Sequence, residues 1–180
     1  MAAPPAPVQV LFVCLGNHCR SPSAHAVAEA MLARHAQPAE PFAQFDSAGT
    51  GRSHVDRAPH PLAVAEGAHR GYRIDHLGRQ IHPDDFARFD LIIAMDRMNV
   101  DDLERMRGGV DLRTGPYVSV EPVQVQVLRR WDPYAMPGDE DLPDPWGKGP
   151  EAYREMFDVI ERTVPSLLDH LAWLHREPTG

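Results

Sequence analysis

One octapeptide constrains this chain more than any other feature of its sequence. Residues 14–21 read Cys-Leu-Gly-Asn-His-Cys-Arg-Ser, directly after the apolar run 8–13 and directly before a pattern typical of a helix. A strand, a tight loop and a helix start in this order form a cradle for an anion, because the loop amides point inward and the helix adds its positive end. A tight turn with two structural cysteines is the alternative, which this context disfavours.

The residue types in this loop favour covalent chemistry on a phosphoryl group. Arg20 offers a planar fork that matches two phosphoryl oxygens. Its charge and the loop amides stabilise the thiolate form of Cys14, which is the nucleophilic form of a cysteine. Gly16 and Asn17 tolerate the left-handed dihedrals that such a loop needs. Ser21 can donate a hydrogen bond to the thiolate while it caps the following helix.

The composition is that of an ordinary globular protein with a single core. The chain has 180 residues, of which 24% are charged and 43% are apolar. A net charge of −8 argues against nucleic acid or an anionic membrane as a partner. Both cysteines lie in the loop, which argues against a disulfide scaffold and favours a cytoplasmic location. We expect a flexible tail at 1–7, one domain at 8–175 and a C-terminal tail at 176–180.

The alternation of strand and helix patterns predicts an α/β fold. We expect strands at residues 8–13, 42–48, 91–95 and 123–128, the last at the edge of the sheet because one of its faces is polar. We expect helices at 22–35, 62–71 and 99–106, loops at 37–41, 49–61 and 131–149, and a long last helix kinked at Pro165. The predicted architecture is a four-stranded parallel sheet with helices on both faces, a flavodoxin-like three-layer sandwich.

The predicted strand ends place the loop where such folds bind ligands. Cys14 follows the first strand, Ser47 ends the second and Asp96 follows the third. In open parallel sheets, ligands bind at the carboxyl ends of the strands. The topology and the loop chemistry therefore predict the same site.

These segments resemble the low-molecular-weight protein tyrosine phosphatases over nearly the whole chain. The matching segments are 13–17 and 19–22 for the signature loop, 47–51 for the second motif, His76, 79–81 and 89–99 for the middle segment, and 144–147 for a late Asp-Pro-aromatic loop. The resemblance implies the phosphotyrosine phosphatase I-like form of the fold. It also implies hydrolysis of protein phosphotyrosine through a phosphocysteine, with no metal ion and no other cofactor.

The resemblance implies a role for each catalytic residue. Cys14 attacks phosphorus, Arg20 holds the phosphoryl oxygens on which charge gathers, and Asp144 serves as general acid and then general base. Asp132, followed by Pro133, has the same Asp-Pro-aromatic pattern as Asp144. The family carries an aromatic-Asp-Pro stretch at that earlier position, so we interpret Asp132 as a turn residue.

The loop itself is expected to bind the phosphoryl oxygens, through Leu15, Gly16, Asn17, His18, Cys19, Arg20 and Ser21. The resemblance implies that the loop is locked by hydrogen bonds of Asn17, Ser21, Ser47 and His76. A preorganised thiolate site depends on such bonds. The alternative for Ser47 and His76 is that they satisfy only local backbone groups. Asp96 matches a family aspartate by position, and we expect a structural role for it.

The pocket wall and the second cysteine leave alternatives open. Ser53 stands where many members carry an aromatic wall, and Trp146 with Leu15 can compensate by stacking on a phenyl ring. The histidines other than His76 show no metal-ligand spacing and are expected on the surface. Cys19 is either a small buried filler or the redox partner of Cys14, which it would protect as a disulfide.

The substrate is the least determined part of the prediction. His18 stands where tyrosine-specific members carry a branched apolar residue and arginine-specific members carry threonine. Histidine fits neither pattern, and a protein arginine phosphatase on the same scaffold is the alternative to a tyrosine phosphatase. An arsenate reductase needs further cysteines, and none follows Cys19. The expected partners are a phosphotyrosyl protein, a tyrosine kinase and free phosphate or sulfate, and the expected state is a monomer.

Overall fold

The computed structural model describes residues 5–35, 41–108 and 124–176 of the chain. One parallel sheet is built from β1 (Val8–Cys14), β2 (Ala43–Gly49), β3 (Leu91–Ala94) and β4 (Gln124–Val127), in the order β2-β1-β3-β4. This confirms the predicted α/β fold with a four-stranded parallel sheet and places β4 at an edge, as predicted. Part of the expected loop 37–41, and Val123 of the expected fourth strand, lie outside the described residues.

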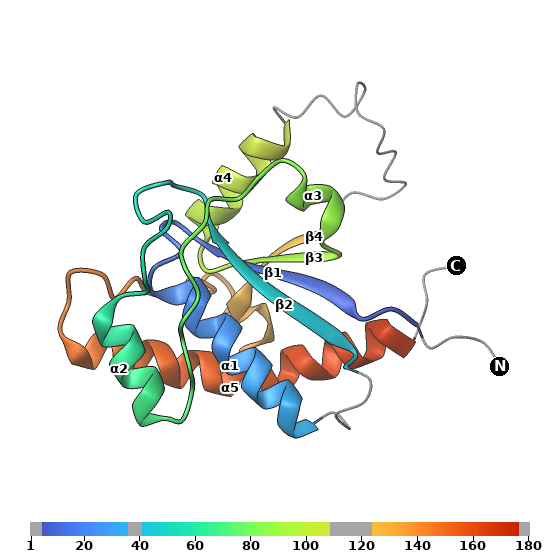
Figure 1. Ribbon diagram of the computed structural model, residues 1–180. Coiled ribbons are helices and arrows are strands. Elements are labelled where there is room, and N and C mark those ends of the chain that lie inside the picture. Colours follow the sequence, from blue (N-terminus) through green and yellow to red (C-terminus); the bar gives the residue numbers. More distant parts are fainter. Residues whose placement is uncertain (1–4, 36–40, 109–123, 177–180) are drawn as a thin grey trace.

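Helices cover both faces of the sheet, as predicted (Figure 1). α1, α2 and α5 lie on one side of the sheet, and α3 and α4 lie on the other. Their bounds are Arg20–His35 for α1, Pro61–His69 for α2, Asp85–Arg88 for α3, Arg97–Gly108 for α4 and Pro150–Arg176 for α5, with a 3-10 turn at Leu128–Trp131. α3 and the 3-10 turn were not predicted, since four residues are too few to show a helical period.

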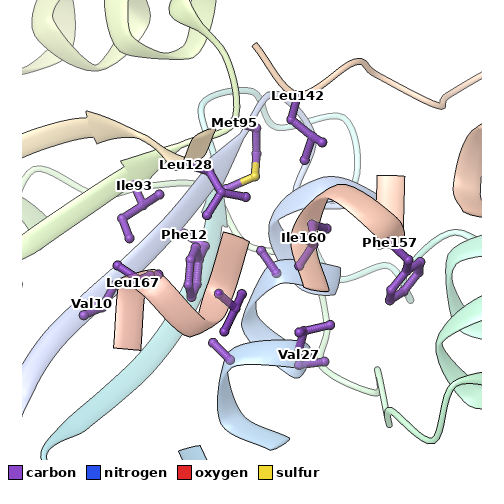
Figure 2. Close-up of a cluster of buried hydrophobic side chains, with 14 of the residues drawn as sticks. Val10, Phe12, Val27, Ile93, Met95, Leu128, Leu142, Phe157, Ile160 and Leu167 are labelled. Carbon is purple, nitrogen blue, oxygen red and sulfur yellow. The ribbon is translucent and has the colours of Figure 1, made fainter. Parts of the chain in front are cut away.

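Both faces of the central strand β1 are buried. Side chains alternate along a strand, so Val10 and Phe12 point to one face while Leu11 and Val13 point to the other. Figure 2 shows Val10 and Phe12 packed with side chains of α1 and α5, among them Val27, Ile160 and Leu167. Burying one such side chain stabilises the fold by about 1.5–3 kcal/mol. This packing fixes the strand end that carries Cys14.

The last helix, α5, runs unbroken through Pro165 from Pro150 to Arg176. It extends one residue beyond the predicted domain end, and residues 177–180 of the expected tail lie outside the described residues. His175 Nε2 donates a hydrogen bond of 3.0 Å to the carbonyl oxygen of Pro5, so part of the expected N-terminal tail contacts this helix. Among the described residues, no helix has the length and apolarity to cross a membrane.

Candidate active site

The loop after β1 turns its carbonyl groups outward. The carbonyl oxygens of Cys14, Leu15 and His18 accept hydrogen bonds from the segment that follows β2, through the N–H groups of Thr50 at 2.9 Å, Gly51 at 2.8 Å and His60 at 2.8 Å. The N–H groups of residues 16–19 find no acceptor within the described part of the chain. Because buried N–H groups need partners, these four amides form a nest for an anion beside the start of α1.

Gly16 and Gly49 allow this loop to pack tightly against its neighbours. For Gly16, this differs from the predicted need for left-handed dihedrals. A Cβ atom on Gly49 would lie 2.8 Å from the carbonyl oxygen of Leu15 and 2.9 Å from the nitrogen of Asn17. A Cβ atom on Gly16 would lie 2.9 Å from Nδ1 of His54. The left-handed residue of the loop is Asn17, with φ of 49°, as predicted for asparagine. Gly16 is therefore needed for close packing and does not adopt a left-handed conformation.

The predicted supporting residues form one buried hydrogen-bond network behind the sulfur. Cys14 Sγ lies 3.1 Å from Ser21 Oγ. The Asn17 side-chain amide donates to Ser21 Oγ and to Ser47 Oγ, both at 3.0 Å. Ser47 Oγ lies 3.3 Å from His76 Nε2. The structure thus brings together all four residues expected to lock the loop, and Ser47 and His76 do more than satisfy local backbone groups.

The network fixes where its protons point. Since Asn17 donates to both hydroxyl oxygens, the Ser21 proton remains for Cys14 Sγ, or for the carbonyl oxygen of Ala48 at 3.3 Å. The Ser47 proton likewise remains for Nε2 of His76, which then accepts as a neutral imidazole. Burial and the neighbouring His25 lower the pKa of His76, in agreement with a neutral ring. A negative charge on Cys14 draws the Ser21 proton toward sulfur.

Arg20 is the first residue of α1 and is buried, with 3% of its surface exposed. Nη1 donates to Asp96 Oδ2 at 2.5 Å and to the Leu142 carbonyl oxygen at 3.0 Å, and Nη2 donates to Asp144 Oδ2 at 3.0 Å. Burial opposes the charge of Arg20, but Cys14, Asp144 and Asp96 outweigh it and raise the pKa of the guanidinium. Asp96 thus positions the fork of Arg20, a more specific role than the structural one predicted.

The two candidate general acids occupy different environments. Asp144 accepts from Arg20 and, through Oδ1, from the Trp146 N–H at 3.1 Å, and it lines the pocket over the loop. Asp132 accepts from the Tyr134 N–H at 3.0 Å, as predicted for a turn residue. It is also buried against two arginine side chains and is absent from the pocket lining. Only Asp144 is placed to meet a bound phosphoryl group.

A pocket of about 410 Å³ opens over the loop. Cys14, Arg20 and Asp144 line it, as do the predicted wall residues Leu15, Ser53 and Trp146. Leu15 and Trp146 are 55% and 62% exposed, so their apolar surfaces are available to a ligand. The structure thus collects the predicted nucleophile, clamp, acid and walls around one cavity.

His54 is a wall residue that the sequence analysis missed. Its ring stacks on that of His18 with centroids 3.9 Å apart, and the edge of His60 meets His18 at 5.3 Å. Burial, His54 and His60 together lower the pKa of His18 to about 4, so its ring is neutral at pH 7. The prediction of surface positions is wrong for these half-buried rings. The only sequence signal for His54 is its place directly after Ser53.

The Cys19 side chain is buried in the core. Its sulfur lies 3.6 Å from the hydroxyl oxygen of Tyr153 on α5, and both cysteines are free thiols in the structure. Burial raises the pKa of Cys19 to about 12. Cys19 therefore fills the core as one predicted alternative required, and it remains a neutral thiol at pH 7.

A family model described as low molecular weight phosphotyrosine protein phosphatase matches residues 9–177. The chain belongs to this family. A low molecular weight protein-tyrosine-phosphatase of Streptomyces coelicolor is 34% identical to it over 160 residues, which are 89% of this chain and 91% of the relative. The predicted family and the predicted enzyme class, protein-tyrosine phosphatase, are confirmed.

Solved structures with the same fold include phosphatases of two kinds. A protein tyrosine phosphatase from Entamoeba histolytica, with Hepes in its active site, is 27% identical with a TM-score of 0.79, covering 92% of this chain and 97% of that one. A Drosophila arginine phosphatase is 29% identical with a TM-score of 0.77, covering 89% and 96%. Within this phosphatase family, the fold alone therefore does not decide between tyrosine and arginine substrates.

Proposed function

We propose that the chain hydrolyses phosphotyrosine on proteins through a phosphocysteine formed on Cys14. One observation carries the proposal: Cys14 and Arg20 of the loop after β1 line the same pocket as Asp144, which is 124 residues after Arg20 in the chain, above the amides of residues 16–19. A nucleophile, an anion clamp and a carboxyl group in this arrangement suit the cleavage of a phosphate ester. The proposal also implies that inorganic phosphate or sulfate binds in the same cradle, and that a tyrosine kinase makes the substrate.

In the first step, the sulfur of Cys14 attacks phosphorus in line with the ester oxygen. The S–P bond forms while the P–O bond to the tyrosine breaks. The amides of residues 16–19 and the fork of Arg20 hold the three remaining oxygens, where charge gathers in the transition state. Asp144 donates a proton to the departing phenolate oxygen, so that tyrosine leaves as a neutral phenol.

In the second step, a water molecule attacks the phosphocysteine. Asp144, now ionised, takes a proton from the water while the S–P bond breaks and phosphate forms. The Cys14 thiolate returns to a position 3.1 Å from Ser21 Oγ, where the hydroxyl proton stabilises it. The buried bonds of Asn17 hold Ser21 in this orientation throughout.

A protein arginine phosphatase is the second candidate. One observation favours it, the similarity to the Drosophila arginine phosphatase. His18, stacked on His54, is neither the branched apolar residue of tyrosine-specific members nor the threonine of arginine-specific ones, so it favours neither substrate. The Trp146 side chain favours the aromatic substrate, because a phenyl ring stacks on an exposed indole. An arsenate reductase has no support, since no cysteine follows Cys19.

The test compares phosphotyrosine and phosphoarginine in peptides of otherwise identical sequence, with one preparation of the protein. We expect a higher kcat/KM for phosphotyrosine. Cys14→Ser is expected to lose turnover with both peptides while it keeps its fold and its affinity for phosphate. A higher kcat/KM for phosphoarginine would replace the tyrosine proposal with the arginine one. Turnover near the wild-type rate in Cys14→Ser would overturn the shared mechanism.

A further inference from the structure

The turn at residues 52–57, beside the pocket, carries two arginines without an acidic partner in the part of the chain that the structure describes. Arg52 and Arg57 are both exposed, and neither forms an ion pair with a described residue. By contrast, Arg70, on α2's C-terminal cap, contacts three carboxylates. Asp56 lies between the two arginines in sequence, is exposed, and pairs with neither within the described residues. The turn therefore presents two available positive charges.

Main-chain hydrogen bonds hold this turn against the pocket. The Arg57 N–H donates to the His54 carbonyl oxygen at 3.1 Å, and the Arg57 carbonyl oxygen accepts from Gly78 at 2.8 Å. The Asp56 N–H donates to the Gly78 carbonyl oxygen at 2.8 Å, and Asp56 has a φ of 60° in this turn. A Cβ atom on Gly78 would lie 2.3 Å from the His54 carbonyl oxygen, so the two segments are in tight contact. The backbone that carries the arginines is thus fixed, while their side chains form no ion pair with residues 5–35, 41–108 or 124–176.

The turn also forms part of the pocket rim. Gly51, Ser53 and His54 line the pocket, so Arg52 lies between lining residues. The charge of Arg57 acts on the ring of His18, another lining residue. Asp144, whose side chain is 45% exposed, also lines the pocket and is already paired with Arg20. The turn therefore brings two basic residues close to the pocket lining.

The charge of the whole chain limits what this turn can attract. At −8, the protein repels large polyanions such as nucleic acid and acidic membranes. A short acidic segment that is already anchored by its phosphoryl group in the cradle meets the arginines locally. An extended peptide advances about 3.3 Å per residue, so positions a few residues from the anchored one pass over the rim.

We propose that Arg52 and Arg57 bind acidic side chains that flank the phosphorylated residue of the substrate. The proposal rests on the proposed function, since the phosphoryl group anchors the peptide. Charge pairs at an exposed rim act mainly through kcat/KM and weaken as salt rises. The turn is thus a specificity-determining surface, separate from the residues that perform the chemistry.

The test uses phosphotyrosine peptides with glutamate, alanine or lysine at the flanking positions, and p-nitrophenyl phosphate as a substrate without flanks. The variants are Arg52→Ala/Arg57→Ala and the control Arg34→Ala. Arg34 is exposed in the last turn of α1, whereas Arg20 at the start of α1 lies at the pocket. At 1.5 Å per residue, the helix separates them by roughly 20 Å.

In the wild type and the control, we expect the glutamate peptide to have a higher kcat/KM than the alanine peptide, and the lysine peptide a lower one. In Arg52→Ala/Arg57→Ala, the ratio of glutamate to alanine should fall roughly three- to tenfold, the size expected for two exposed charge pairs. Turnover of p-nitrophenyl phosphate should stay within about twofold, since it does not reach the rim. The preference should shrink as salt is added.

Two results would overturn the inference: equal kcat/KM for all three peptides in the wild type, or a preference that survives in the double variant. Failure of the proposed function looks different, because then no phosphotyrosine peptide is hydrolysed. In that event the same three flanks are compared in phosphoarginine peptides, where the same ratio and the same loss in the double variant are required.

Discussion

Nη2 of Arg20 donates a hydrogen bond of 3.0 Å to Oδ2 of Asp144, so the proposed phosphate clamp and the proposed proton donor are in direct contact. The other nitrogen of the same fork is held by Asp96 at 2.5 Å. A phosphoryl group in the cradle competes with both carboxylates for these N–H groups. Substitution of each carboxylate therefore separates proton transfer from the positioning of Arg20.

Asp144→Asn should lower kcat by roughly 10²–10⁴ on phosphotyrosine peptides, the usual contribution of general acid–base catalysis. The loss should be smaller for p-nitrophenyl phosphate, because nitrophenolate leaves without much need of a proton. Steady-state and pre-steady-state rates of both substrates check this. The matched control is Asp132→Asn, which should keep kcat within about threefold, since Asp132 does not line the pocket. A larger loss in the control would reverse the assignment of the two aspartates.

Asp96→Asn should lower kcat/KM roughly tenfold or more, because a misdirected guanidinium no longer matches the phosphoryl oxygens. The asparagine oxygen can still accept from the Asn99 N–H, as Asp96 Oδ1 does at 2.7 Å, so the start of α4 should survive. Circular dichroism and the melting temperature check that point. Asp101→Asn, an exposed site on the same helix, serves as the control. Wild-type kinetics in Asp96→Asn would show that Arg20 needs no positioning by this carboxylate.

The free energy of unfolding should fall in acid, because Asp132 becomes protonated. Burial opposes its charge, but hydrogen bonds from Arg162, the Tyr134 N–H and Arg129 outweigh burial and lower the pKa from 3.8 to about 2. The unfolded chain therefore binds the proton first as pH falls. The stabilisation, about 2 kcal/mol, is complete above pH 4 and lost as pH falls toward 2. Urea unfolding between pH 2 and 7 measures this, and the corresponding slope should vanish in Asp132→Asn.

Peroxide should inactivate the protein by oxidising Cys14. A disulfide between Cys14 and Cys19 should make this inactivation reversible by a reducing agent. Peroxide converts the Cys14 thiolate to a sulfenic acid, and attack by the Cys19 sulfur expels hydroxide and forms a disulfide. With a pKa of about 12, Cys19 has a thiolate fraction that grows about tenfold per pH unit, so disulfide formation should accelerate from pH 7 to 9. After dithiothreitol, Cys19→Ser should regain much less activity than the wild type. Equal recovery in both would leave Cys19 with a packing role only.

The strands of the sheet and most of the site residues could be predicted from the sequence, because their signals lie in short runs of consecutive residues. Runs such as 8–13 and 91–95 are too short and too β-branched for helices, and the structure places β1 and β3 within one residue of them. The loop from Cys14 to Ser21 was located because its chemistry lies in consecutive residues. Asp144 was distinguished from Asp132 only through the family resemblance, since their local patterns are the same.

The missed features depend on contacts between residues far apart in the chain. The pairing of Arg20 with Asp96 spans 76 positions, and the stacking of His18 on His54 depends on the path of the segment after β2. Neither contact leaves a period in the sequence. The close packing at Gly16 was likewise misjudged as a need for left-handed dihedrals, because its neighbour His54 was unknown.

The central claim, a phosphocysteine on Cys14, is tested most directly by rapid acid quenching during turnover, followed by mass spectrometry of the peptide that contains residues 14–20. We predict the mass of one added phosphoryl group on Cys14 in the wild type and none in Cys14→Ser. With p-nitrophenyl phosphate, whose leaving group needs little protonation, the phosphorylated fraction should be larger in Asp144→Asn, because water activation is slow there. Turnover of phosphotyrosine peptides by the wild type with no phosphoryl group on Cys14 at any quench time, or with one on another residue, would contradict the account.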